Sequence, residues 1–447
     1  MKKVSILITI MILVLASCNS KMDAENSEKC MHLNTIATGN QKELKELSNG
    51  GFCGDFDYGY GQKELLHKAS WELGHITLAT SISRSFNVTA DNILWEWSFG
   101  RSVQWIKEEP PLKKLDDVVF VDAGSMNHSL VIRTDGSLWA WGSNSSGEIG
   151  DGTTASRWTP VKIMEGVISA AAGQRSGFAV RNDGTLWAWG NTSRGNLGDG
   201  TLTDWKEMRS SSYYIQPTPI KILDNVTSVA AGEWHGMALK TDGSLWVWGE
   251  NSSGEIGNGT ITVINYDITY HWRGEMREDN DAVKPVKIME NIAHIAAGPS
   301  TSFAVDVDGN LWGWGLNNFG QLGDGTTVNR LMPVKIMEDV ATIAPGFTHL
   351  LAIRTDGSLW GWGKNYFGEL GVKIGTQTKI PVKIMEDVIF AVAGMSVGPS
   401  PDGIDQGAGR SFAIRADGSL WGWGVIHHGE NGTSLTPIEI TYDMMLP

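Results

Sequence analysis

Short apolar stretches alternate with glycine-rich polar turns along most of this chain, and the alternation itself repeats. Its most regular element is a pair of tryptophans two residues apart, which recurs seven times at intervals of 44 to 66 residues. A repeat of this length, built from short strands and glycine turns, is typical of a propeller or a solenoid. The pairs are Trp95/Trp97, Trp139/Trp141, Trp187/Trp189, Trp246/Trp248, Trp312/Trp314, Trp360/Trp362 and Trp421/Trp423.

Each copy of the repeat predicts four short strands. In the clearest copy they begin near Pro333, Ile343, His349 and Leu359. An Asp-Gly pair precedes the Trp strand, and it predicts a two-residue hairpin turn in which both residues have positive φ. Both sides of the Trp strand are apolar, which indicates burial between stacked sheets. The chain is therefore predicted to be all-β, with a seven-bladed β-propeller of four-stranded antiparallel blades over residues 71–447.

The last strand of the repeat also predicts how the ring closes. The segment Pro437–Ile440 is the final Pro-Val-Lys-Ile-type strand, and the first copy lacks such a strand upstream. We therefore expect it to pair with the first blade near Ile76–Thr80 and to latch the ring. The repeat has no defined start, so the framing of blades and the strand order within a blade stay open.

The start of the chain has the features of an export signal. A basic beginning is followed by an apolar run that ends at Leu15, too short to span a bilayer as a helix, and then by small residues. The Leu-Ala-Ser-Cys end resembles a bacterial lipoprotein cleavage box, in which Cys18 is lipidated. We expect a lipoprotein signal peptide over 1–17, a tether with a short helix over 18–70, and lipid anchoring at the cell envelope outside the cytoplasm. Secretion without a lipid is the alternative.

The charge and cysteine content of the chain limit the classes of partner and ligand that it is expected to bind. Without the signal, 34 basic and 50 acidic side chains remain, a net charge of −16. Such a surface repels phosphate backbones, and no basic stripe offsets it, so nucleic-acid binding is disfavoured. Cys30 and Cys53 are candidates for a disulfide outside the cytoplasm, with free thiols as the alternative. No Cys/His cluster has zinc spacing, and no motif indicates a cofactor.

One string of the repeat carries a family resemblance. It runs through Ala231–His235 and Asp242–Gly249, and it continues into the loop Glu250–Thr260. This string resembles the regulator of chromosome condensation repeat, and the resemblance covers about 370 residues. It implies a seven-bladed β-propeller, in a family that includes nuclear exchange factors for a small GTPase, ubiquitin-ligase modules and a secreted bacterial inhibitor of β-lactamases. Exchange activity fits poorly, because a lipid-anchored envelope protein does not meet a cytoplasmic GTPase.

Three copies of the repeat contain insertions, at about 202–216, 261–282 and 395–409. Each insertion follows either the strand that carries Ala-Ala-Gly, which is the one that begins near Ile343 in the clearest copy, or the strand that carries the Trp pair. The loops after these two strands leave an antiparallel blade by the same face. Loops on a rigid scaffold often carry function, and Trp, Tyr and Arg are enriched at binding hot spots. Packing loops without a binding role are the alternative. The candidate binding residues are Trp205, Arg209, Tyr213, Tyr214, Tyr266, Tyr270, Trp272, Arg273 and Arg277.

Two further sets of polar residues are expected to be structural. One set stands seven residues before each Asp-Gly pair, and we expect its side chains to bond loop backbone within their own blades rather than a ligand at the channel mouth. The other set, Asp151, Asp199 and Asp324, occurs in Gly-Asp-Gly-Thr segments that lack the ligand density of a calcium loop. No metal site and no catalytic residue is assigned. The first set is Arg84, His128, Ser176, His235, Thr301, His349 and Arg410.

These observations favour a non-catalytic binding protein of the cell envelope, attached to the membrane through Cys18 and binding a macromolecule, above all a protein. One alternative is an inhibitor of an extracytoplasmic enzyme. Another is a propeller that binds or cleaves polysaccharide, with Trp205 and Trp272 stacking on sugar rings. Carboxylates converging in a cleft would favour cleavage, whereas an exposed aromatic patch would favour protein binding. No GTPase is expected as a partner.

Overall fold

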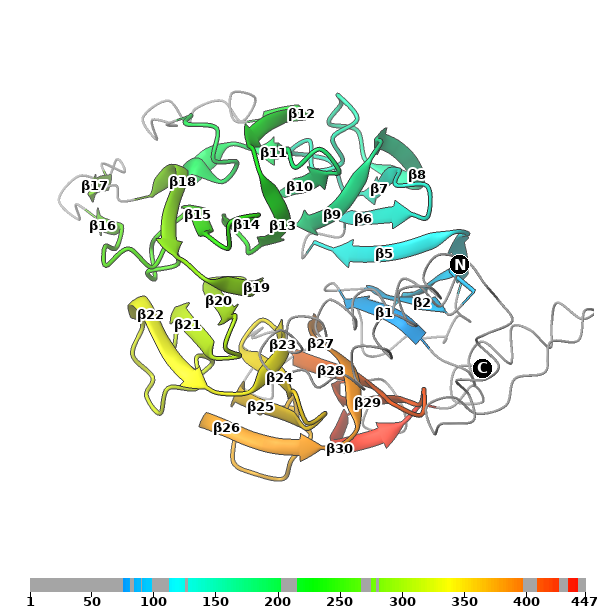
Figure 1. Cartoon of the computed structure of the whole chain (residues 1–447), viewed down its shortest axis with the longest axis vertical. Coiled ribbons are helices and arrows are strands. Elements are labelled where there is room, and N and C mark those ends of the chain that lie inside the picture. The colour runs from blue at the N-terminus through cyan, green and yellow to red at the C-terminus, as the bar shows by residue number, and fades with distance from the viewer. Residues whose placement is uncertain are drawn as a thin grey trace, which may run out of the picture. The chain divides into compact units, whose positions relative to one another are not determined.

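The computed structural model of this chain separates into two compact units, Met1–Trp71 and Glu72–Pro447. All the residues that the structure describes belong to the second unit, and they form seven four-stranded antiparallel sheets and one two-stranded sheet. The four-stranded sheets stand as blades round a central axis (Figure 1), which confirms the predicted seven-bladed β-propeller. The described ranges are 75–80, 84–89, 91–98, 112–124, 128–201, 215–266, 275–278, 281–396, 408–425 and 433–440.

Each blade takes its four strands in chain order from the inside to the outside of the ring. The innermost strands are β1 (His75–Thr80), β5 (Val118–Ala123), β9 (Val167–Ala172), β13 (Val226–Ala231), β19 (Ile292–Gly298), β23 (Val340–Pro345) and β27 (Val388–Ser396). The second strands are β2 (Arg84–Thr89), β6 (His128–Arg133), β10 (Ser176–Arg181), β14 (His235–Lys240), β20 (Thr301–Asp306), β24 (His349–Arg354) and β28 (Ala408–Arg415).

The third strands carry the tryptophan pairs, and the outer strands carry the Pro-Val-Lys-Ile motif. The third strands are β3 (Leu94–Ser98), β7 (Leu138–Gly142), β11 (Leu186–Asn191), β15 (Leu245–Gly249), β21 (Leu311–Gly315), β25 (Leu359–Lys364) and β29 (Leu420–Val425). The outer strands are β4 (Leu112–Leu115), β8 (Arg157–Met164), β12 (Ile215–Leu223), β18 (Ala282–Met289), β22 (Arg330–Met337), β26 (Gln377–Met385) and β30 (Thr433–Glu439).

In five of the pairs the second tryptophan bonds its blade to the one before it, whereas the buried Nε1 of Trp141 has no such partner among the described residues. Trp189, for example, is fully buried, and its indole Nε1–H donates to the backbone carbonyl of Glu148 in the preceding blade at 2.8 Å. Gly150 makes this approach possible, since it has a φ of 83° and a Cβ there would lie 2.8 Å from the indole nitrogen. The same bond recurs from Trp248, Trp314, Trp362 and Trp423.

The turn before each Trp strand differs from the predicted hairpin. In the second blade Gly136 has a φ of 78°, but Asp135 is not among the residues with positive φ. Gly136 N–H donates to the carbonyl of Arg133, so the turn is a three-residue loop with a left-handed glycine at its end. The aspartate side chain instead accepts bonds from the Ser137 N–H and hydroxyl. The first blade has Asn92 at the left-handed position, with a φ of 63°.

The ring closes without the predicted latch. Strand β30 pairs with β29 and completes the seventh blade, and β1 pairs only with β2 within the first blade. The first blade has its own outer strand, β4, so no place is left there for a strand from the C-terminal end. Closure comes instead from the inner strand β1, which lies beside both β5 and β27. The latch prediction was wrong because it took the outer strand as the start of a blade.

The second insertion contains secondary structure of its own. Its ends form a hairpin, β16 (Val263–Tyr266) and β17 (Glu275–Glu278), between β15 and β18. A single turn of 3-10 helix, η2 (Ser193–Gly195), follows β11. Within the described part of the chain, no helix has the length and apolarity that a membrane crossing requires.

Candidate functional site

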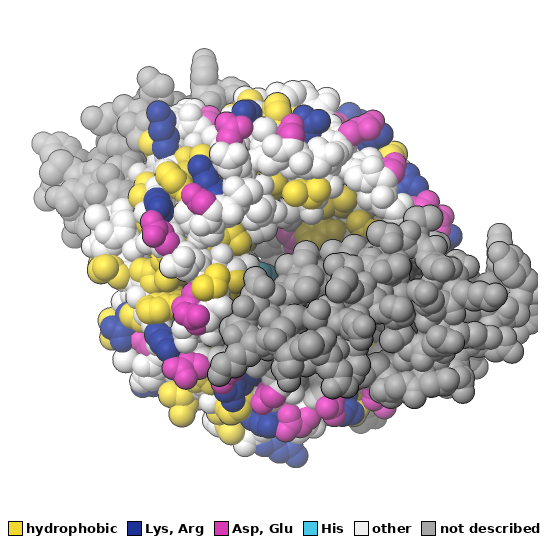
Figure 2. Space-filling model, viewed as in Figure 1, with side chains coloured by type: hydrophobic (Ala, Val, Ile, Leu, Met, Phe, Trp, Pro, Cys, Tyr) yellow, Lys and Arg dark blue, Asp and Glu magenta, His cyan; other side chains and the backbone are white. Residues whose placement is uncertain are grey.

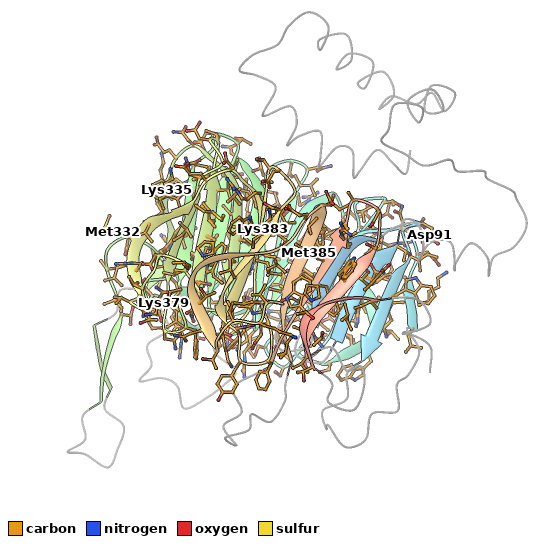
Figure 3. All side chains as sticks on the ribbon, turned by 90° about the horizontal axis from the view of Figure 1, so that it is seen from below. Asp91, Met332, Lys335, Lys379, Lys383 and Met385 are labelled. Atoms are coloured by element: carbon orange, nitrogen blue, oxygen red, sulfur yellow. The ribbon has the colours of Figure 1, made fainter. Side chains whose placement is uncertain are left out.

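The antiparallel strand order sorts the loops onto two faces of the ring. Loops from the first to the second strand and from the third to the fourth leave by one face, here called the insertion face. The strand ends that border 202–216, 261–282 and 395–409 all lie on it, as predicted. The Asp-Gly turns and the links between blades lie on the opposite Asp-Gly face. Figure 3 shows the β16–β17 hairpin projecting from the insertion face, away from Lys335 and Lys383.

The sequence-predicted binding residues lie almost wholly outside the described residues. Tyr266 ends β16, where it pairs with Glu275, and Arg277 lies on β17 opposite Ile264. The backbone therefore brings these two onto one hairpin, and their side chains are not described. The remaining candidates in the insertions and the N-terminal cysteines lie outside the described ranges and stay predictions: Trp205, Arg209, Tyr213, Tyr214, Tyr270, Trp272, Arg273, Cys18, Cys30 and Cys53.

A polar cluster occupies the insertion face of the third and fourth blades, where the first two insertions begin. It consists of Gln174, Arg194, Glu233, Trp234 and Glu250, each on a loop of that face. Arg194 pairs with the Glu250 carboxylate, and its guanidinium carbon lies 5.2 Å from the centre of the Trp234 ring. Gln174 Nε2 donates to Glu233 Oε1 at 3.1 Å. The cluster therefore links the two blades that carry these insertions.

The cluster holds two carboxylates, Glu233 and Glu250, and one guanidinium, that of Arg194. Burial raises the pKa of Glu233, and the nearby Glu250 charge raises it further, while Arg194 opposes both effects. Arg194 adopts a left-handed conformation with a φ of 60°, which is costly for a residue with a side chain. Each carboxylate of the cluster has a neighbouring donor, Arg194 for Glu250 and Gln174 for Glu233.

A second group of carboxyls on this face is structural. Glu148, Glu255 and Glu369 are buried, and each accepts a bond from a backbone N–H two residues earlier. Burial is the main cause that raises the pKa of each, and that of Glu255 reaches about 7. In the fifth blade Gln321 makes the same bond to Phe319 N–H, at 2.9 Å. Because an amide oxygen accepts the same backbone bond, this position is needed to close the loop and not to transfer a proton.

Six of the seven polar residues that precede the Asp-Gly pairs by seven positions are buried, all but Arg84, whose side chain is not described, and the bonds of two of them differ from the prediction. His235 Nε2 lies 3.0 Å from the Ser302 hydroxyl of the next blade, and His349 makes the matching contact to Ser411 at 2.9 Å. Each serine hydroxyl donates to a carbonyl of the histidine's own blade, Glu255 or Glu369, so the histidine must be the donor to the serine. These pairs join neighbouring blades instead of bonding loop backbone within one blade.

These histidine–serine pairs also lack the chemistry of a nucleophilic site. Burial lowers the pKa of His235 to about 4 and that of His349 to about 3, so both rings are neutral at pH 7. A base must accept the serine proton, whereas here the histidine donates. Both side chains of each pair are also buried. Burial lowers the pKa of His128 to about 4 and that of Arg410 to about 9 in the same way.

The Gly-Asp-Gly-Thr segments are turns. Asp151 Oδ1 accepts from the Thr153 N–H at 3.0 Å, and its other oxygen accepts from Arg157 at 2.8 Å. Asp324 is likewise paired with Arg330. Across the described ranges, no group of three or more His, Cys, Asp or Glu side chains is placed to hold a metal ion.

The Asp-Gly face carries a regular set of ion pairs. In six blades a lysine on the outer strand pairs with an acid three residues later, and Figure 2 shows such dark blue and magenta pairs round the ring. Exposed pairs of this kind contribute little to stability. The pairs are Lys113–Asp116, Lys162–Glu165, Lys221–Asp224, Lys287–Glu290, Lys335–Glu338 and Lys383–Glu386.

Sequence reasoning missed one group on the insertion face. Phe319, Tyr366 and Phe367 stand in turns after the Trp strands of the fifth and sixth blades, and Phe347 stands in the loop between β23 and β24. Tyr366 and Phe347 are exposed. A comparison of the repeats would have found the first three, because the second and fourth blades have Ser-Ser at the positions of Tyr366 and Phe367.

The fold and the sequence match known proteins. The model of the RCC1-like domain matches residues 98–443. The chain is 26% identical to the ultraviolet-B receptor UVR8 of Arabidopsis thaliana over 233 residues, which are 50% of this chain and 46% of that protein. It is 27% identical to protein RCC2 of Homo sapiens over 210 residues, 45% of this chain and 26% of that protein. The matched region thus spans less than half the length of these relatives.

Solved structures show the same architecture. Yeast RCC1 (Prp20), solved with Kap60 bound, superimposes with a TM-score of 0.55 at 20% identity, covering 72% of this chain and 74% of that chain. Human WBSCR16 gives a TM-score of 0.57 at 19% identity, covering 72% and 84%. At these identities the likeness concerns the fold. Since the family model spans most of the propeller, the chain belongs to the RCC1-like domain family of seven-bladed β-propellers.

Proposed function

We propose that this chain is a non-catalytic, envelope-anchored propeller that binds a protein partner through its insertion face. One observation carries the proposal: the departures from the repeat gather on that face, whereas the opposite face repeats the same lysine–acid pair in blade after blade. A rigid ring supplies the scaffold, and irregular loops with aromatic and arginine side chains supply recognition.

The relatives support binding as the mode of action. The yeast relative Prp20p was solved in a study that describes its binding to Gsp1p and histones, and another structure holds it with Kap60. From these relatives we infer for this chain only that its partner is a protein. We still expect that the partner is not a GTPase. Among the described residues, the buried carboxyls and histidine–serine pairs all have structural partners, which supports a role without catalysis.

Anchoring rests on the Leu-Ala-Ser-Cys box at the start of the chain. If Cys18 is lipidated, Cys18→Ser should move the protein from the membrane fraction to the soluble extract, because a peripheral ring has no other anchor in this proposal. Mass spectrometry of the mature N-terminus measures the modification directly. A wild-type protein that begins upstream of Cys18 and stays soluble would overturn this part of the proposal.

The binding proposal is tested by capture from envelope extract. Wild type is compared with the double variant Trp272→Ala/Tyr214→Ala on the insertions and with Lys335→Ser/Lys383→Ser on the Asp-Gly face. We expect the partner to be lost at least about tenfold with the insertion variant, as for the removal of hot-spot aromatics, and kept with the other. Equal capture by all three proteins, or loss confined to the lysine variant, contradicts the assignment of the binding face.

A further inference from the structure

Phe319, Tyr366 and Phe367 lie in turns whose backbone does not require them. The turn after the sixth Trp strand reads Asn365-Tyr366-Phe367-Gly368, and that of the second blade reads Asn144-Ser145-Ser146-Gly147. Both turns are closed by the same bond, in which Asn365 or Asn144 Oδ1 accepts a backbone N–H five residues on, at 3.0 and 2.9 Å. Serine therefore satisfies the fold at these positions, and the aromatic side chains need another explanation.

A buried cation holds these rings together across two blades. The side chain of Lys364 is almost fully buried, and its ammonium lies 5.7 Å from the ring centres of both Phe319 and Phe367. Such cation–π contacts attract both rings to the same ammonium group. Tyr366 packs on Phe367 with ring centres 5.8 Å apart and is 50% exposed. The arrangement presents an aromatic surface in a defined position rather than a set of independent loops.

Aliphatic side chains extend this surface toward the rim of the ring. Ile374, Ile380 and Leu435 are exposed by 39%, 58% and 51%. The loop that contains Ile374 is bonded to Asn365 through the carbonyls of residues 372, 374 and 375. The turn glycines Gly320 and Gly368 pack against the backbone of Lys379 and Leu435, which places Phe319 and Phe367 beside the outer strands of the next blades.

We name this surface the aromatic patch: Phe319, Tyr366, Phe367, Ile374, Ile380 and Leu435. Exposed apolar side chains that gather on one part of a surface mark an interaction site. None of these residues belongs to the three insertions, so the patch goes beyond the binding proposed above and does not depend on it.

The charges beside the patch identify its partner's chemistry. Lys373 and Lys379 are exposed, and neither has a carboxylate within 4.0 Å in the described part of the chain. By contrast, Lys383 on the same blade and Lys335 on the preceding blade are each paired with a glutamate. In a chain with a net charge of −14, two unpaired lysines flanking an apolar surface favour carboxylates on the occupant.

We propose that the aromatic patch docks an extended segment of a protein partner in which acidic residues flank aliphatic or aromatic side chains. The apolar side chains cover Tyr366, Ile374 and Ile380, and the carboxylates pair with Lys373 and Lys379. A sugar ring fits less well, because the Tyr366 and Phe367 rings are inclined by 58° and are bordered by aliphatic rather than hydrogen-bonding side chains.

The test uses the whole chain and fluorescein-labelled peptides of 12 residues. One peptide alternates Glu or Asp with Leu or Phe, a second replaces its acids by Lys, and a third replaces its apolar residues by Ser. Fluorescence anisotropy should show the first peptide binding at least about tenfold more tightly than the others, with an affinity that falls as salt screens the charges. A neutral oligosaccharide serves as a fourth probe.

Variants locate the site. Phe319→Ser/Tyr366→Ser/Phe367→Ser gives the turns the serines of the second and fourth blades, and it should weaken binding of the acidic apolar peptide at least about tenfold. Lys373→Glu/Lys379→Glu should reverse the charge preference. The charge-matched control, Lys221→Glu/Lys287→Glu on the Asp-Gly face, should leave the affinity within about twofold of wild type. Thermal unfolding checks that each variant is folded.

Four results would overturn the proposal: no peptide binding, equal binding of the basic peptide, wild-type affinity in the triple serine variant, or oligosaccharide binding that depends on Tyr366. If the triple serine variant does not fold, the lysine reversal alone decides, because exposed lysines leave the ring intact. All variants keep the insertions, so the loss of peptide binding and the loss of a partner captured by the insertions are separate outcomes.

Discussion

One buried position of the repeat, occupied by a glutamate or a glutamine, closes the loop after the Trp strand through its side-chain oxygen. Glu255, Glu148 and Glu369 use one carboxylate oxygen to close their own loop, and Gln321 does so with an amide. The bond therefore needs an acceptor, not a charge. Taking a carboxylate out of water disfavours its ionised form, which is why the pKa of Glu255 rises to about 7.

This shift makes a prediction about pH. The folded state holds the Glu255 proton up to pH 7, whereas the unfolded chain releases it near its usual pKa of 4.5. The unfolded state therefore binds fewer protons between those values, and the free energy of unfolding falls as pH rises through them. Glu255→Gln, which copies Gln321, should remove this part of the loss, on the order of 3 kcal/mol between pH 4.5 and 8.

Denaturant unfolding at pH 5, 6, 7 and 8 measures the effect. Glu165→Gln, at an exposed carboxyl, is the control and should follow the wild-type curve. Below pH 6.5 the buried histidines act in the opposite direction, because His235 and His349 have lowered pKa values and the unfolded chain takes up their protons first. The two histidines outweigh Glu255 until about pH 7, so stability should peak near that pH. An unchanged pH slope in Glu255→Gln would contradict the assigned role.

At the scale of elements, the Trp strand does two separate tasks. In the third to seventh blades the second tryptophan of the pair is fully buried and bonds the preceding blade, as Trp189 does with Glu148. The first is half-buried near the Asp-Gly turn and donates within its own blade, as Trp187 does to the Thr185 hydroxyl at 2.9 Å. One strand thus joins its blade to a neighbour and anchors its own hairpin.

The two tasks predict different costs for the same substitution. Trp189→Phe removes the bond to the Glu148 carbonyl and leaves a cavity, so it should lower the free energy of unfolding by about 2 to 3 kcal/mol. Trp187→Phe removes a bond near solvent, and water can replace it, so it should cost under about 1 kcal/mol. Guanidinium chloride unfolding of both variants gives the comparison. Equal losses would show that burial of the second tryptophan does not connect the blades.

The elements were largely predictable from the sequence, and their connections were not. The tryptophan spacing predicts seven Trp strands, and each is found. The Asp-Gly pair could not distinguish two turn types, because glycine has positive φ in both, and the structure has the three-residue loop. The spacing also could not reveal that His235 bonds Ser302 in another blade. The tryptophan and histidine bonds between blades join residues 41 to 67 positions apart, and a local pattern holds no information on them.

At the scale of the molecule, the two faces of the ring differ in regularity: one repeats the same turns from blade to blade, and the other varies in loop length and sequence. The Asp-Gly face carries short turns and exposed ion pairs that recur with the repeat. The insertion face carries every enlarged loop, the polar cluster round Arg194 and the aromatic patch round Tyr366. The sequence indicated the face through the positions of the insertions. It could not indicate the polar cluster, whose members meet only when the third and fourth blades stack.

Ring closure supplies a prediction for the molecule as a whole. The outer strand β30 is bonded only to β29, and its Leu435 supports the turn at Gly368, so deleting 433–447 should disturb the seventh blade and this turn alone. Hydrogen exchange should rise in β29 and near Gly368 and stay low in β9 and β13, because the inner strands still contact each other. Deleting 72–80 removes β1 from between β5 and β27, and the whole ring should then exchange and melt at a lower temperature. If removal of β30 instead raised exchange in β1 and β2, the chain's end would latch the first blade after all, and the closure described by the strand pairing would be incorrect.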